Sequence, residues 1–215
     1  MPGASSNGSE PGMTTHRLEA LTDGIFSIAM TLMVLSLALP EAAKGVTHAE
    51  FVHLLLGQTD KFLNYALSFV LLALFWIGHH QQFHFIKRTD GRLLWINIFT
   101  LMFIALVPFS TSLIGGYPHE WLAEIFFDSN IFILGILFIS NWAYATKDHR
   151  LVDRSLDSEY IALRKKRGVV TPIVAAIAMG LSFLNTDLCF YVYLLIPVIQ
   201  GVMAGRHRKM TGDTG

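Results

Sequence analysis

Six stretches of the chain are apolar enough, and long enough or nearly so, to cross a lipid bilayer as helices. A spanning helix needs roughly 20 predominantly apolar residues, and hydrophobic residues make up 53% of the sequence against 15% charged residues. The sequence therefore predicts an all-α, polytopic membrane protein with six transmembrane helices. Between the first two spans, a short amphipathic helix is expected on the outer surface over residues 47–57. The expected spans are residues 18–40, 62–86, 93–116, 121–146, 169–184 and 188–205.

The distribution of basic residues predicts the orientation, because Lys and Arg collect in cytoplasmic loops. With the N-terminus inside, all of the 16 Lys and Arg residues except Lys44 and Lys61 fall on the cytoplasmic side. We therefore expect a multi-pass cell-membrane protein with both termini in the cytoplasm. Its parts would be a disordered tail at 1–16, a transmembrane domain at 17–205 and a C-terminal tail at 206–215.

Composition and motifs exclude several functions. The 16 basic residues are balanced by 16 acidic ones, so no net positive field is available to bind nucleic acid. The sequence has no phosphate-binding loop, nucleophile elbow or metalloprotease helix motif. No enzymatic activity and no cofactor are expected.

The first span carries two stripes that suit a pore. One contains Glu19, Asp23, Ser27 and Thr31 at i, i+4 spacing, which places them on one side of a helix. The adjacent stripe is aliphatic. A hydroxyl stripe beside an aliphatic one is typical of a narrow pore with a hydrophobic constriction; alternatively, the aliphatic residues face lipid and the hydroxyls face neighbouring helices. The aliphatic residues are Leu21, Ile25, Ile28, Leu32, Leu35 and Leu39.

The second span ends in His79, His80 and His84, and the last two have the i, i+4 spacing that can hold a metal ion. One hypothesis is therefore a membrane metal or haem redox protein. The alternative is a structural role in which these histidines hydrogen-bond to the first or third span, where Trp95 and Asn97 lie at matching depth.

Two further charged clusters allow two interpretations each. Glu120, Glu124 and Asp128 recur at i, i+4 and would concentrate cations near a pore mouth, or Asp128 is the cap of a shorter span. In the loop 147–168, alternating charges suggest a surface helix that ends in four consecutive basic residues, or a solvated loop at anionic headgroups. These four are Arg164, Lys165, Lys166 and Arg167.

The start of the first span resembles a known family. The run 17–23, RLEALTD, resembles the RxxxFSD signature of the transmembrane protein 175 family, the potassium channels of endosomes, lysosomes and prokaryotes. Leu21 stands for Phe and Thr22 for Ser, and both keep the chemical type. The similarity continues through residues 24–32, through Trp76 and the first two histidines, and through 92–97 to 108–109.

The resemblance implies a homotetramer in the lipid bilayer that passes K⁺, and other monovalent cations, through a central pore lined by the first helix. Carried over by position, the constriction would be Ile28, Leu32 and Leu35, and Thr31 with Ser27 would contact the ion. The signature's polar network would be Arg17, Leu21, Thr22, Asp23, His79, His80, Trp95 and Asn97. A third possibility is a proton-coupled transporter in which Asp23 or Glu19 carries the proton.

Overall fold

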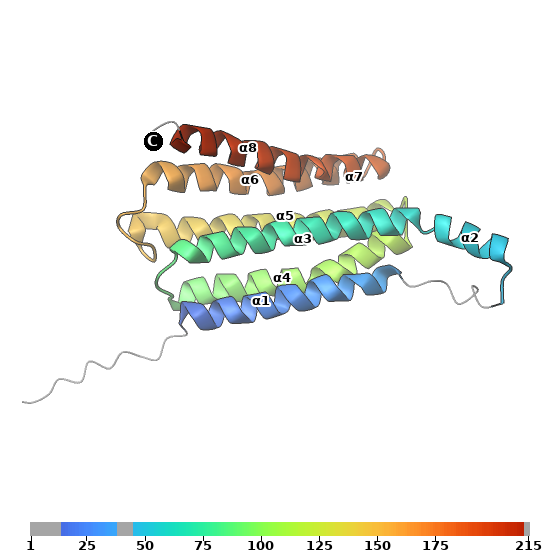
Figure 1. Ribbon diagram of the computed structural model, residues 1–215, viewed down its shortest axis with the longest axis horizontal. Helices are drawn as coiled ribbons and strands as arrows, with labels where there is room; N and C mark the ends of the chain where they lie inside the picture. The colour runs from blue at the N-terminus through green and yellow to red at the C-terminus, as the bar shows by residue number, and fades with distance from the viewer. Residues whose placement is uncertain (1–13, 38–44, 213–215) are drawn as a thin grey trace, which may run out of the picture.

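Figure 1 shows the computed structural model of the chain as long helices lying side by side, with one short helix beyond the end of the bundle. The structure describes residues 14–37 and 45–212, with side chains up to Met203. The prediction of an all-helical fold is confirmed in this part of the chain. The helices are α1 (Thr15–Leu32), η1 (Met33–Leu37), α2 (His48–Leu56), α3 (Thr59–Phe85), α4 (Gly91–Gly116), α5 (Trp121–Thr146), η3 (Lys147–His149), α6 (Ser158–Leu181), α7 (Asp187–Tyr193) and α8 (Leu195–Gly212).

Four described segments have the length and composition of membrane spans: Thr15–Leu37, Thr59–Phe85, Gly91–Gly116 and Trp121–His149. They coincide with the first four expected spans. The other two expected spans correspond to α6 and to the pair α7 and α8. Basic residues occupy the first half of α6, and Asp187–Met203 is a shorter apolar helical segment, so a total of six spans stays a prediction.

The bundle has three layers in Figure 1: α1 with α4, then α3 with α5, then α6 with α7 and α8. Apolar residues from every layer form one core, as expected for helices that are apolar on several sides. Its fully buried members include Phe26, Leu71, Ile104, Leu134 and Tyr193. This packing holds α1 at one edge of the molecule.

A glycine allows close packing between α5 and α6. A Cβ atom at Gly135 would lie 2.6 Å from Cδ of Pro172, which is closer than van der Waals contact permits. The absence of a side chain at this position therefore allows the proline ring of α6 to pack directly against the α5 backbone.

The segment after α5 differs from its prediction. Residues 147–157 fold back onto the bundle, where Leu151 and Val152 are buried with Phe83 and Ile86, and Ile86 pairs with Val152 in an isolated bridge. The four basic residues do not end a separate surface helix. They lie inside α6, which runs without a break from Ser158 to Leu181, because the apolar residues after the basic run continue the same helix.

Asp90 links the start of α4 to the end of α5 through hydrogen bonds. It caps α4 by accepting a hydrogen bond from the backbone N–H of Leu93 (2.9 Å), and its other oxygen accepts one from the Tyr144 hydroxyl (2.6 Å). Burial favours the neutral acid, but these hydrogen bonds and the nearby Arg150 outweigh it, so the pKa of Asp90 lies below its ordinary value.

The two terminal helices and the short helix α2 can be compared with their predicted bounds. Helix α1 begins at Thr15, two residues inside the tail expected at 1–16, and the rest of that tail is outside the described residues except Thr14. Helix α8 continues to Gly212, into the expected C-terminal tail. The predicted helix at 47–57 is confirmed as α2, which Thr47 and Glu50 start with a reciprocal capping box.

Candidate functional site

Helix α1 has one buried face, and the residues on it follow helical spacing. Leu18, Thr22, Phe26 and Ala29 are buried at intervals of three or four residues, and Met33 continues the series in η1. These side chains pack against α3 and α4. The rotation of α1 about its own axis is therefore fixed by packing.

A chain of buried hydrogen bonds joins α1 to α4 and α3. The amide nitrogen of Asn97 donates to the Thr22 hydroxyl at 3.2 Å, and the amide oxygen of Asn97 lies 3.0 Å from Nε2 of His79. Thr22 in turn donates to the carbonyl of Leu18. All three polar side chains are at most 3% exposed, so each depends on its partners for hydrogen bonding. His79 is also stacked on Phe83, with ring centroids 4.2 Å apart.

A second contact ties the exposed edge of α1 to α3. The indole nitrogen of Trp76 donates to a carboxylate oxygen of Asp23 at 2.9 Å, and the ring of His80 stacks on the Trp76 ring with centroids 6.1 Å apart. The sequence comparison singled out Trp76 but did not place it in the network. The i, i+4 spacing of Trp76 and His80, one helical turn apart like His79 and Phe83, was the available signal.

The opposite face of α1 is bare in the single chain. Ile28 is 59% exposed, Leu32 45% and Leu35 67%. Ser27 and Thr31 are exposed beside them. The Thr31 hydroxyl donates within its own helix, to the carbonyl of Ile28 at 2.9 Å with that of Ser27 at 3.1 Å. The oxygen of Thr31 therefore keeps its acceptor capacity. Leu39 lies outside the described residues.

Three exposed members of the predicted network take no part in these two sets of contacts. Trp95 is 60% exposed and its ring contacts Phe99. Leu21 is 45% exposed, and Arg17 is exposed in the first turn of α1. The structure thus brings together Thr22, Asn97 and His79, and separately Asp23, Trp76 and His80.

The three histidines of α3 differ in exposure. His79 is buried, whereas His80 and His84 are exposed, and His84 packs edge-on against Phe85. A neighbouring buried pair escaped the sequence analysis: Asn141 donates to Gln82 at 2.9 Å, and Gln82 donates to the carbonyl of Phe138.

The acidic stripe on α5 faces α7. Asp128 is fully buried and accepts a hydrogen bond from the Tyr193 hydroxyl at 2.7 Å, while Glu120 is exposed. The interpretation of Asp128 as a helix cap is wrong, because α5 begins at Trp121, a full seven residues earlier. Glu124 and Asp128 place their oxygens within 4.8 Å of the Cys189 sulfur.

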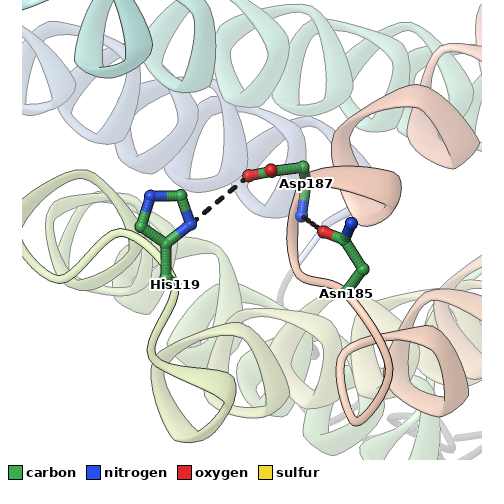
Figure 2. A network of polar contacts seen from close by, with 3 residues as sticks. All are labelled: His119, Asn185 and Asp187. Carbon is green, nitrogen blue, oxygen red and sulfur yellow. Dashed lines mark hydrogen bonds and ion pairs between the residues drawn. The ribbon is translucent and has the colours of Figure 1, made fainter.

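A polar contact joins the connection between α4 and α5 to the start of α7. Figure 2 shows His119 pointing toward Asp187, whose backbone N–H donates to the side chain of Asn185. The His119 and Asp187 side chains are 3.5 Å apart and 73% and 65% exposed. An ion pair exposed to this degree contributes little to stability.

Comparison with known proteins identifies the family of this chain. Residues 17–108 match the family model described as endosomal/lysosomal potassium channel TMEM175. A potassium channel of Chamaesiphon minutus is 31% identical over 183 residues, which are 82% of this chain and 90% of that protein. The chain belongs to the TMEM175 family. The family match includes α1, α3 and most of α4, which are the helices that carry the Thr22, Asn97 and His79 contacts.

Further relatives extend the similarity along the chain. A potassium channel of Streptomyces collinus is 27% identical over 191 residues, 86% of this chain and 90% of that protein. The crystal structure of a lysosomal potassium-selective channel TMEM175 homolog from Chamaesiphon minutus matches with a TM-score of 0.75 and 29% identity, covering 89% of this chain and 97% of that one. This TMEM175 chain is thus a membrane protein of a channel family, and these matches give no support to the metal or haem redox hypothesis.

Proposed function

We propose that the chain is the subunit of a potassium-permeable channel in which four copies of α1 surround a central pore. The observation that carries the proposal is the bare face of α1, where Ile28, Leu32 and Leu35 are 45–67% exposed while the opposite face is packed and hydrogen-bonded. An aliphatic stripe at the edge of a bundle needs a lipid or a protein partner. The Chamaesiphon and Streptomyces relatives, both named potassium channels, favour the second.

In this tetramer, a ring of four Ile28 side chains would form the narrowest constriction. A purely aliphatic ring closes a pore by expelling water, or forces an ion to shed part of its hydration shell when the ring is wider. Thr31 lies one turn further along. Because its hydroxyl hydrogen is bonded inside the helix, four Thr31 oxygens would offer acceptors to a passing K⁺ and distinguish it from Na⁺. No covalent step or cofactor is required.

The same proposal assigns the membrane topology. Helices α6 and α7–α8 would complete six spans, and residues 17–205 would form the channel domain between cytoplasmic tails. Lys87 and Arg88, which follow α3, and the four basic residues in the first half of α6 would face the cytoplasm, in line with the positive-inside rule.

The experiment is K⁺ flux from liposomes that contain the purified protein, calibrated with valinomycin. Ile28→Asn is expected to raise the flux, because a polar ring keeps the constriction wet. The matched control is Ile177→Asn, the same substitution at a position of α6 that is 50% exposed in the layer farthest from α1 (Figure 1). It is expected to conduct like the wild type.

Protein-dependent flux that rises only with Ile28→Asn would support both the channel and its pore helix. Equal effects of the two substitutions would remove α1 from the pore. Absence of flux from well-folded wild-type protein would contradict the channel function itself.

A further inference from the structure

A cavity lies between the middle and outer layers of the bundle, on the side away from the bare face of α1. Its volume is about 330 Å³, and residues of α3, α5, α6 and α8 line it. The lining residues of α3 run from Leu71 to Gln82, which is about 16 Å of helix at the usual rise per residue. The cavity is therefore long enough for a segment of an acyl chain.

The cavity is apolar at one end and cationic at the other. Leu71, Phe75 and Ile196 line the apolar end. Arg164 and Arg167, three residues apart on α6, line the other end and are both half-buried. A cavity that is apolar at one end and carries two guanidinium groups at the other is complementary to an anionic amphiphile.

Among the described residues, the two arginines donate hydrogen bonds to neutral groups. Arg164 donates to the Tyr160 hydroxyl at 3.0 Å and to the side-chain oxygen of Gln81. Arg167 donates to the carbonyl of Gln200 at 3.1 Å. Among the described residues, the ion pairs found within 4.0 Å do not include either arginine. A guanidinium group has five N–H donors, so donors are left for an anion.

The basic run of α6 separates into two pairs. Arg164 and Arg167 line the cavity, whereas Lys165 and Lys166 are exposed and do not. This division follows from helical geometry, since residues three apart share a face and the two between them point elsewhere. Arginine also suits a phosphate better than lysine does, because its planar fork can bind two oxygens at once.

We propose that this cavity binds one anionic phospholipid, with its phosphate at Arg164 and Arg167 and part of an acyl chain between α3 and α8. Basic pockets between transmembrane helices are known to hold anionic headgroups in this way. The site is separate from the proposed pore, and it holds whether or not the chain conducts K⁺.

The test measures the thermal unfolding midpoint of the purified full chain in a non-ionic detergent, titrated with phosphatidylglycerol or with phosphatidylcholine of the same acyl chains. A ligand that binds only the folded protein raises the midpoint. We expect phosphatidylglycerol to raise the unfolding midpoint along a saturable curve that fits one binding site. Phosphatidylcholine should raise the midpoint much less. Equal shifts with the two lipids would overturn the proposal.

Two charge variants compare the arginine pair with the lysine pair in the same lipid titration. The double variant Arg164→Gln, Arg167→Gln is expected to weaken phosphatidylglycerol binding about tenfold or more, since it removes the charge-assisted bonds. The double variant Lys165→Gln, Lys166→Gln removes the same charge and is expected to bind like the wild type. Equal losses in both would show a general surface attraction and overturn the cavity assignment.

A second pair of variants leaves all four charges in place. A Cβ atom at Gly201 meets no atom within 4 Å, and Gly201 lines the cavity, so Gly201→Leu is expected to fill it and reduce binding. Gly180 has equally open space but does not line the cavity, so Gly180→Leu is the control. Undiminished binding in Gly201→Leu, or an equal midpoint shift with soluble glycerol phosphate, would overturn the acyl-chain position.

Discussion

The two faces of α1 differ in what holds them. The inner face has Thr22 and Phe26 buried against α3 and α4, with Asn97 bridging Thr22 and His79. The outer face is largely exposed and carries the aliphatic Ile28 and Leu35 beside the hydroxyls of Ser27 and Thr31. The comparison shows that a buried hydrogen-bonded network fixes one side of the helix while its other side stays exposed. The inner face should therefore govern stability and the outer face conduction.

The largest effect is expected from Asn97→Leu. The substitution keeps the side-chain size but removes the hydrogen bonds of Asn97 to the buried Thr22 and His79, and each lost bond of a buried group costs about 1–3 kcal/mol. The free energy of unfolding in detergent should therefore fall by about 2–4 kcal/mol. Trp95→Leu is the control on the same helix, because Trp95 is 60% exposed. Equal losses from the two variants would show that the network does not hold α1.

Phe26→Ala should have the next largest effect. Phe26 is 1% exposed, and its truncation leaves a cavity that loses packing contacts in a membrane protein too. We therefore expect the free energy of unfolding, measured with denaturant, to fall by about 2 kcal/mol. The matched change on the outer face is Leu35→Ala, which should stay within about 0.5 kcal/mol of the wild type and alter K⁺ flux instead. The reverse order of stabilities would contradict the division between the faces.

Trp76→Phe tests the contact at the boundary between the faces. It removes the hydrogen bond to Asp23 but keeps an aromatic ring beside His80, so the expected cost is about 0.5–1 kcal/mol. Asp23→Asn retains an acceptor oxygen and should be as stable as the wild type. A clear loss of stability in Asp23→Asn would show that the charge of Asp23, rather than its oxygen, holds Trp76.

Thr31→Ala should have the smallest effect on stability. Its hydroxyl donates only within its own helix, so unfolding should change by no more than about 0.5 kcal/mol. The reversal potential in mixed K⁺ and Na⁺ should nevertheless show a lower K⁺ preference, with Thr31→Ser retaining it. An unaltered reversal potential in Thr31→Ala would remove this hydroxyl from ion selection.

Much of this architecture could be predicted from the sequence. Apolar length and helical spacing located the first four spans. Four of the six predicted stripe residues, Leu21, Ile28, Leu32 and Leu35, are 45–67% exposed, whereas Ile25 is partly buried against the core. Helix periodicity predicts which residues share a face, because that depends only on the local backbone.

The partners across helices could not be predicted in the same way. Trp95 was expected as a partner from its depth, but Trp76 is the tryptophan that donates to α1, since the choice depends on how packing rotates α3 and α4. The same limitation applies to the segment 147–157, whose charges suggested a surface position although Leu151 and Val152 anchor it in the core. Contacts far apart in the chain leave no periodic signal.

The contact between Gly135 and Pro172 has a consequence for the shape of the interior. Gly135 also lines the cavity between the middle and outer layers, so the spacing of α5 and α6 is limited at that depth by a hydrogen atom instead of a methyl group. One added methyl group would act as a spacer, moving α6 outward and changing the width of the cavity without touching either arginine.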